Sequence, residues 1–288
     1  MASIQPKYLR LHPLSPANLP SHHVLKNTPE NLPNLRDFCA SLITEGRRLT
    51  ETDLTANFVA DGKKTSPPAK AQVQISKWTR KYDDPSDASK QAVEYWFARH
   101  SEHKDPDPTW DDFVKGLYEN HSENEAEYTP DVYDCREVCK WDVDEGEFEG
   151  MEGVTLRAVE MCHELPVVAN RVFATLVLTA KYIQGKGFIV VQVPLDLQGV
   201  EAAIYSNHTN TTHKDSGTAL KKKKVVVGQY ASVERCTYNE AEQIVSWDMA
   251  TAADAKGDIP MLLQKPTMPG KIAVDVGFFA AFVEKQKK

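Results

Sequence analysis

The stretch ATAADAKGDIP, residues 250–260, joins a strand-like segment to a long C-terminal helical pattern. The preceding residues, EQIVSWDM (242–249), alternate between apolar and polar side chains, which predicts a β-strand. Asp254 can accept backbone N–H groups within a turn, and Gly257 tolerates a positive φ. Pro260 suits the start of a helix, where no backbone N–H is needed. We therefore expect a sharp structural corner that sets the angle of the last helix.

The C-terminal segment has the pattern of a helix that begins near Pro269 and Gly270. Its apolar residues recur at helical spacing: Ile272, Val276, Phe279 and Val283. An apolar stripe of this kind must lie against another apolar surface. The strand-like segments that precede it are the expected partner.

Several other segments have the pattern of strands or helices. Strands are expected at 71–82, 91–101, 187–197, 224–238 and 242–252, and helices at 33–49 and 109–128. Residues 153–165 and 170–183 fit either structure. Residues 1 to about 30 are rich in Pro, His, Ser and Asn, which indicates an extended arm, and 206–224 is a polar segment without periodicity.

Composition limits the classes of protein that fit this chain. With 288 residues and 41% hydrophobic content, the chain can form one large domain or two small ones. The net charge of −7 argues against general nucleic-acid binding. The five cysteines fit reduced thiols better than disulfides, and no apolar run approaches the ~20 residues that span a bilayer. We expect a soluble, cytoplasmic protein.

The corner and two further segments resemble the START superfamily, which has the helix-grip fold. The corner matches as Asp254 to Pro260, and LPVVANRVFATLVLTAKY (165–182) and VVVGQYASVERC (225–236) are similar to START strands. More narrowly, EYWFARHSEH (94–103), NHSENEAEYTPDVYD (120–134) and MATAADAKGDIPM (249–261) resemble a fungal family of START-like proteins, a domain of unknown function. The resemblance covers about residues 68–286.

This resemblance implies an α+β helix-grip fold, in which a curved antiparallel sheet wraps around a long C-terminal helix. Residues 1–67 would form an extra N-terminal arm and helix packed on a START-like domain at 68–288. The resemblance also implies a cavity between sheet and helix for a lipid, sterol or polyketide-like molecule. The residues expected to line it are Tyr95, Phe97, Arg99, Glu160, Val191, Gln229, Trp247, Met249, Ile272, Val276 and Phe279.

Three of these residues are polar and share a strand face with apolar neighbours, which makes them candidates for ligand anchors. Arg99 could bind a carboxylate or phosphate, or it could form a structural ion pair. Glu160 could pair with Arg99 or act as a base, and Gln229 could bind a ligand oxygen. These faces assume strands without bulges, because one extra residue inverts them.

Most START members bind or transfer their ligand, and some relatives cyclise or aromatise polyketides. We therefore keep two alternatives to a carrier. The first is a cyclase-like or dehydratase-like enzyme using Arg99, Glu160 and Tyr230, although Tyr230 is expected to point away from the Gln229 face. The second is an interaction module with a filled core.

The sequence gives little support for a metal or a cofactor. His121 and Glu125 stand four apart but lack a third ligand, and Cys135 and Cys139 lack a second cysteine pair. We expect neither group to bind a metal. The run Lys221, Lys222, Lys223 and Lys224 is either a solvated loop end or a contact with an anionic membrane surface.

Overall fold

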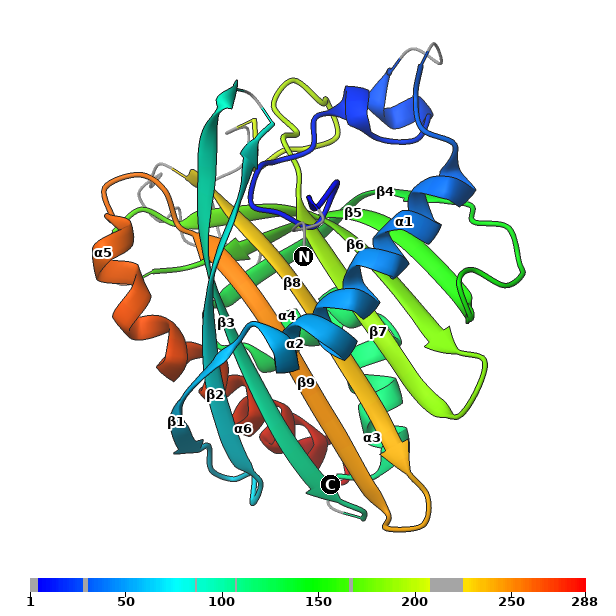
Figure 1. Ribbon diagram of the computed structural model, residues 1–288, viewed down its shortest axis with the longest axis vertical. Coiled ribbons are helices and arrows are strands. Elements are labelled where there is room, and N and C mark those ends of the chain that lie inside the picture. The colour runs from blue at the N-terminus through cyan, green and yellow to red at the C-terminus, as the bar shows by residue number, and fades with distance from the viewer. Residues whose placement is uncertain (1–4, 28–30, 86, 107, 166–167, 208–224) are drawn as a thin grey trace.

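The computed structural model describes residues 5–27, 31–85, 87–106, 108–165, 168–207 and 225–288. These residues form one sheet of nine strands, with helices on both of its faces (Figure 1). The strands are β1 (Val59–Thr65), β2 (Gln72–Asp84), β3 (Asp87–Lys104), β4 (Val132–Trp141), β5 (Met151–His163), β6 (Arg171–Tyr182), β7 (Lys186–Pro194), β8 (Val226–Asn239) and β9 (Ile244–Asp254).

The helical segments fall into an N-terminal, a central and a C-terminal group. They are η1 (Pro16–Asn18), η2 (His23–Leu25), α1 (Leu35–Arg48), η3 (Leu49–Asp53), α2 (Leu54–Ala56), α3 (Trp110–Phe113), η4 (Val114–Tyr118), α4 (His121–Tyr128), α5 (Met261–Gln264), η5 (Lys265–Thr267) and α6 (Met268–Gln286). None of the helices in the described ranges is long and apolar enough to cross a membrane.

The strand order is β1-β2-β3-β9-β8-β7-β6-β5-β4, and neighbours in this order pair antiparallel. The last strand, β9, pairs with β3 and so joins the two halves of the sheet. The curved antiparallel sheet and the long C-terminal helix confirm the helix-grip fold predicted from the sequence. Both ambiguous segments, 153–165 and 170–183, are strands.

One face of the sheet, here called the outer face, is covered by α1 and the N-terminal arm (Figure 1). The helix begins after Asn34, whose side chain accepts the backbone N–H of Arg36 at 2.9 Å. It buries Phe38, Leu42 and Ile43 against the strands. Gly46 allows a close approach, since a Cβ at this position would lie 2.6 Å from Val191.

The N-terminal arm belongs to the same core as the sheet. The Glu45 carboxylate accepts the backbone N–H groups of Lys7, Tyr8 and Leu9 at 2.7–3.2 Å. Buried Glu94 accepts the N–H of Leu11 at 2.5 Å and also bonds Arg80, Tyr82 and Trp96. The arm therefore docks onto the outer face through the half-buried Glu45 and the buried Glu94, while a domain boundary at residue 67 stays a prediction.

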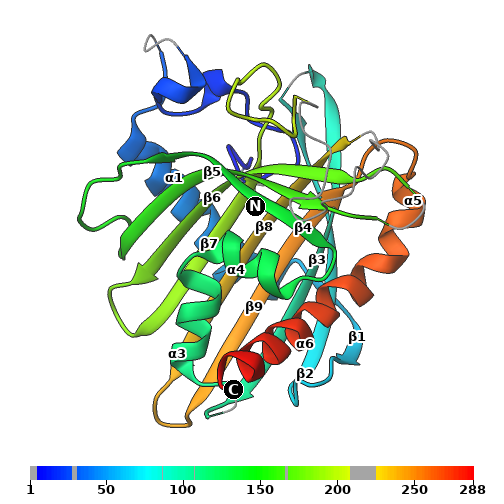
Figure 2. The same ribbon diagram turned by 180° about the vertical axis from the view of Figure 1, so that it is seen from behind.

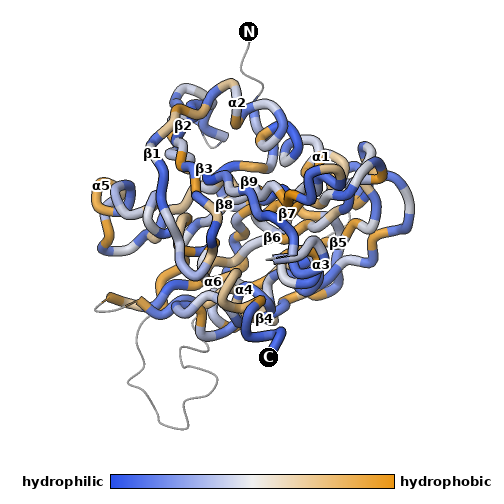
Figure 3. The backbone as a smooth tube through the Cα atoms, turned by 90° about the horizontal axis from the view of Figure 1, so that it is seen from below, coloured by the Kyte–Doolittle hydropathy of each residue, from blue (hydrophilic) through white to orange (hydrophobic). Residues whose placement is uncertain are grey.

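The opposite face, here called the inner face, carries α3, η4, α4 and α6 (Figure 2). Viewed from below in Figure 3, α1 and α2 lie on one side of the strands and α4 and α6 on the other. The rings of Phe113, Trp247 and Phe279 pack together with centroids 4.9–5.6 Å apart. This aromatic cluster fills one part of the space between sheet and helix.

Candidate ligand cavity

A cavity of about 390 Å³ lies between the inner face and the α5–α6 segment. Much of its wall is apolar: Met161, Leu165, Phe173, Met249, Ile259, Leu263, Met268, Ile272, Val274 and Phe278. Leu263 and Val274 are also exposed on the molecular surface, as is Lys271 beside them. These three residues therefore mark the mouth of the cavity.

The corner at residues 254–264 positions the helix that closes this cavity. Asp254 accepts the backbone N–H of Lys256 at 2.9 Å, and Gly257 has a φ of +62°. Gln264 accepts the N–H of Ala255 and donates to the carbonyl of Ile259, both at 2.8 Å. The corner is thus held at both ends by side chains, as expected for a turn that fixes a helix direction.

Six of the polar side chains that line the cavity are here called the polar end. They are Glu125 on α4, Thr175 on β6, Gln192 on β7, Tyr230 on β8, Thr251 on β9 and Asp275 on α6. They come from six different elements, so the fold alone brings them together. A largely apolar pocket with a few convergent polar groups is the common form of a small-molecule site.

A buried ionic cluster lies behind the polar end. The guanidinium of Arg99 lies 3.8 Å from the ring centre of Trp247, and its Nη2 lies 3.4 Å from Oε2 of Glu234. The indole N–H of Trp247 donates to the same carboxylate oxygen at 2.8 Å. Arg99 and Glu234 are both almost fully buried, so each neutralises the other inside the protein.

His121 connects this cluster to the cavity wall. Its Nδ1 lies 2.7 Å from the carbonyl oxygen of Leu117, which can only accept, so Nδ1 carries the proton. Its Nε2 lies 3.1 Å from the amide nitrogen of Gln192 and 3.6 Å from the Glu125 carboxylate. Nε2 of His121 therefore accepts from the Gln192 amide and fixes its orientation at the polar end, with Glu125 beside it.

The carboxyl groups of the polar end are perturbed by their surroundings. Burial raises the pKa of Asp275 to about 7, and the nearby Glu125 and Glu234 carboxylates add to this rise. Burial also raises the pKa of Glu125. At the cavity wall, burial and the charge of Lys271 lower the pKa of His163 to about 4, so this imidazole is neutral at physiological pH.

The residues expected to line the cavity divide into three groups. Met249 and Ile272 line it. Tyr95, Phe97, Arg99, Trp247, Val276 and Phe279 lie on the inner side as expected, but they pack in the core beside the cavity. Large aromatic side chains occupy the space that a ligand would otherwise take at that end.

Glu160, Val191 and Gln229 lie on the outer face, so the prediction that they line the cavity was wrong about their orientation. Glu160 is buried and accepts the backbone N–H of Tyr205 at 3.2 Å and of Ser206 at 2.6 Å. Val191 packs beneath Gly46 of α1. Gln229 alternates with Tyr230, and it is Tyr230 that reaches the cavity.

Sequence reasoning missed most of the polar end. Asp275 carried a usable signal, because it is the only charged residue between Lys271 and Glu284. Gln192 also stood out, as a polar residue within the apolar run IVVQV (189–193). Thr175 had no such signal, because a threonine is ordinary in any strand. The described residues contain no group of three or more His, Cys, Asp or Glu placed to hold a metal ion.

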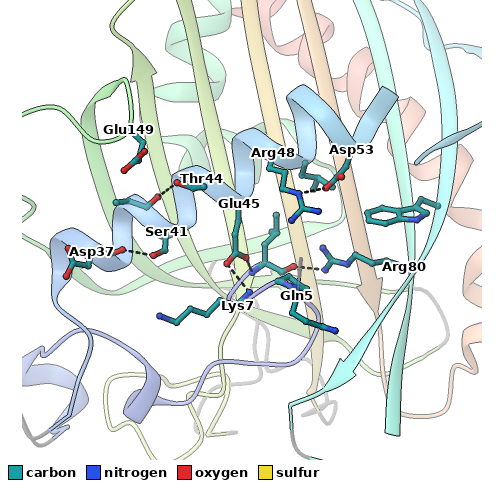
Figure 4. A pocket seen from close by; sticks show the side chains of 15 residues that line it. Gln5, Lys7, Asp37, Ser41, Thr44, Glu45, Arg48, Asp53, Arg80 and Glu149 are labelled. Carbon is teal, nitrogen blue, oxygen red and sulfur yellow. Dashed lines mark hydrogen bonds and ion pairs between the residues drawn. The ribbon is translucent and has the colours of Figure 1, made fainter. Parts of the chain in front are cut away.

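A second, larger hollow of about 470 Å³ lies on the outer face between the N-terminal arm and α1 (Figure 4). Its polar groups bind one another: Glu45 accepts the arm's N–H groups, Arg80 donates to the carbonyl of Leu9, and Arg48 pairs with Asp53. This hollow is therefore a structural seam, and the inner cavity is the better ligand site.

The curved sheet and the closing C-terminal helix together define the helix-grip fold. Human STARD10 has a similar structure, with a TM-score of 0.56 and 11% identity over 88% of this chain and 80% of that one. Human StAR-related lipid transfer protein 5 is also similar, with a TM-score of 0.51 and 10% identity over 86% of this chain and 98% of that one.

Sequence comparison then places the chain within a family. Residues 96–283 match the model of the family described as "Protein of unknown function (DUF3074)", and the chain belongs to this family. A search of curated proteins found no matching sequence. The family match runs from within β3 to within α6 and contains every residue of the polar end.

Proposed function

We propose that this protein binds a hydrophobic small molecule, of the lipid, sterol or polyketide-like class, in the inner cavity and carries it without turnover. The observation that carries this proposal is the apolar cavity of about 390 Å³ between the sheet and the C-terminal helix. One protein of similar fold is named a lipid transfer protein, which supports this kind of ligand. Apolar ligand surface buried there contributes about 25 cal/mol per Å².

The two alternatives fit the geometry less well. A cyclase-like or dehydratase-like enzyme using Arg99, Glu160 and Tyr230 requires three groups that face one site. Glu160 lies across the sheet, with its carboxylate bound to the 205–206 backbone. A filled-core interaction module does not account for an apolar cavity with a rim of exposed side chains.

The mouth of the cavity suits a ligand that arrives from an apolar environment. Leu262 and Leu263 are 76% and 64% exposed, and Leu263 lines the cavity. We include a transient membrane contact at this mouth in the proposal, with Lys271 beside it. The predicted contact through Lys221, Lys222, Lys223 and Lys224 lies outside the described residues, and the fungal and cytoplasmic assignments stay predictions.

Native mass spectrometry of the purified protein, paired with organic extraction of the same sample, tests the carrier. The expected result is a discrete extra mass that is lost on denaturation and recovered in the extract as an apolar molecule. A ligand-free mass with no shift on challenge by a broad lipid panel would contradict it. Membrane contact is tested separately, because equal binding to neutral and anionic vesicles at low salt rules out an electrostatic contribution.

A further inference from the structure

The polar end has an unusual charge balance for a site in a cavity wall. Arg99 lies behind the wall and is neutralised by Glu234, at 3.4 Å. Glu125 and Asp275 line the cavity itself and form no ion pair with any lysine or arginine among the described residues. Two carboxyl groups of the polar end therefore face the cavity, and the basic groups beside them are the His121 imidazole, 3.6 Å from Glu125, and Lys271, which lines the same cavity.

Burial is the largest influence on the pKa of Asp275, and the charged groups that act on it come from three other elements and from its own helix. Glu125 on α4 and Glu234 on β8 raise its pKa, while Arg99 on β3 and Lys271 on its own helix lower it. The net result is a pKa of about 7, so these cations do not compensate for the loss of water and the nearby carboxylates. An additional anion at this place would likewise lose its water, and it would lie beside the two carboxyl groups that line the cavity.

The polar end also contains a hydroxyl group without a partner. Thr175 is 1% exposed, lines the cavity, and its Oγ1 has no hydrogen-bond partner among the described residues. A buried polar group without a hydrogen-bond partner is costly, so a ligand atom that bonds it is favoured. Thr175 can both donate and accept, whereas ionised Glu125 and Asp275 can only accept.

We propose that the polar end selects an apolar ligand whose polar group donates hydrogen bonds, a hydroxyl or an ammonium group, and rejects carboxylates and phosphates. A hydroxyl group can donate to Asp275 or Glu125 and accept from Thr175. An ammonium group can donate to both carboxylates and neutralise them. This replaces the expectation that Arg99 anchors an anion, because that guanidinium lies against Trp247 behind the wall. The inference rests on the proposed function of the cavity.

Displacement of the neutral dye Nile red by three amphiphiles with the same tail tests this selectivity. Dodecanol, dodecylamine and dodecanoate differ only in their polar group, and the assay is run at about pH 8, above the Asp275 pKa of about 7. We expect dodecanol and dodecylamine to displace the dye at concentrations roughly tenfold or more below that required for dodecanoate.

Asp275→Asn removes one charge and keeps the side-chain shape. It should reduce the ratio of the displacing concentrations of dodecanoate and dodecylamine by roughly tenfold. Glu284→Gln, which removes an exposed charge on the same helix, is the matched control. It should leave this ratio of displacing concentrations unchanged. Glu125→Gln provides an independent second variant if Asp275→Asn does not fold cooperatively.

The possible outcomes separate the two proposals. If Nile red binds but dodecanoate displaces it as well as dodecanol does, the selectivity is refuted and the carrier function stands. If Asp275→Asn and Glu125→Gln leave the selectivity unchanged, the carboxylates are not its cause and the inference also fails. If neither the dye nor any amphiphile binds, the carrier function fails and the selectivity fails with it.

Discussion

Replacing Asp275 by asparagine should stabilise the ligand-free protein at alkaline pH. The carboxyl has a pKa of about 7 in the folded chain, against an ordinary value of 3.8. Because the pKa of this carboxyl is raised in the folded chain, the protonated carboxyl contributes fully to stability below pH 3.8. This contribution is lost as the pH rises through about 7. Since a tenfold change in a protonation equilibrium is worth about 1.4 kcal/mol, the full loss at about pH 8 is about 4 kcal/mol.

The measured gain in the free energy of unfolding should be smaller than this full value, because Asp275 is half-buried and part of its surface faces the cavity. We expect Asp275→Asn to raise the free energy of unfolding by about 2 kcal/mol at about pH 8, and by less than half of that at about pH 5. Urea unfolding followed by circular dichroism at both pH values gives this difference. Glu284→Gln should show no comparable pH-dependent gain.

Two results of this unfolding experiment would refute the reasoning. If Asp275→Asn is no more stable than the unmodified protein at about pH 8, the ionised carboxylate is well accommodated in the cavity. If it is more stable by the same amount at both pH values, the gain comes from packing rather than from ionisation. In either case the charge argument for ligand selectivity loses its basis.

Three further substitutions test the buried polar structure. Arg99→Met leaves Glu234 buried without its cation, so the free energy of unfolding in urea should fall by about 3–5 kcal/mol; unchanged stability would show that the pair is not a structural unit. Gln264→Ala removes the side chain that holds the corner, and should cost about 1–3 kcal/mol and speed amide hydrogen exchange at Ala255; unchanged exchange would contradict its role. Glu94→Gln removes the charge of the carboxylate that binds the N-terminal arm. The arm should then be cleaved in limited proteolysis at a lower urea concentration than in the control variant Glu284→Gln. Equal protection of the arm in both variants would mean that apolar contacts alone hold it.

The corner and the final helix could be predicted because their signals are local. Gly257 and Pro260 restrict the backbone within a few residues, and the stripe from Ile272 to Val283 needs only helical spacing. Both features appear in the structure, with Gly257 at positive φ and the stripe buried against the sheet. The local chemistry of a turn is decided by its own residues.

The orientation of the strands could not be predicted in the same way. Alternation in a strand divides its residues into two sets but does not say which set faces the cavity. Here helices cover both faces, α1 on one and α6 on the other, so apolar residues are buried on both faces of the sheet. Tyr230 and Gln229 were assigned to the wrong faces for this reason. Arg99 on β3 lies on the inner side, but it packs against Trp247 and is not among the residues that line the cavity.

The polar end could not be predicted because it is assembled from six elements distant in sequence. His121 and Glu125 were recognised as a pair four residues apart near the end of a predicted helix, where a hydrogen bond was expected rather than a metal site. Their partners are Gln192 on β7 and Glu234 on β8, which no spacing within the helix can reveal. A spacing of four residues shows only that two side chains lie on the same face of a helix. The other residues of the site come from strands, whose positions this spacing does not give.

The same residues also distinguish a ligand cavity from a defect in packing. In a filled core, an apolar residue at position 275 would continue the stripe of Ile272 and Phe279 and avoid the cost of burying a carboxylate. Asp275 instead faces a hollow lined by Thr175, whose hydroxyl lacks a partner among the described residues. A hydrogen-bonding ligand lowers the cost of both groups at once, because it replaces the water that burial removes. A core without a ligand leaves both costs in place, so the carrier explains these two residues and the filled core does not.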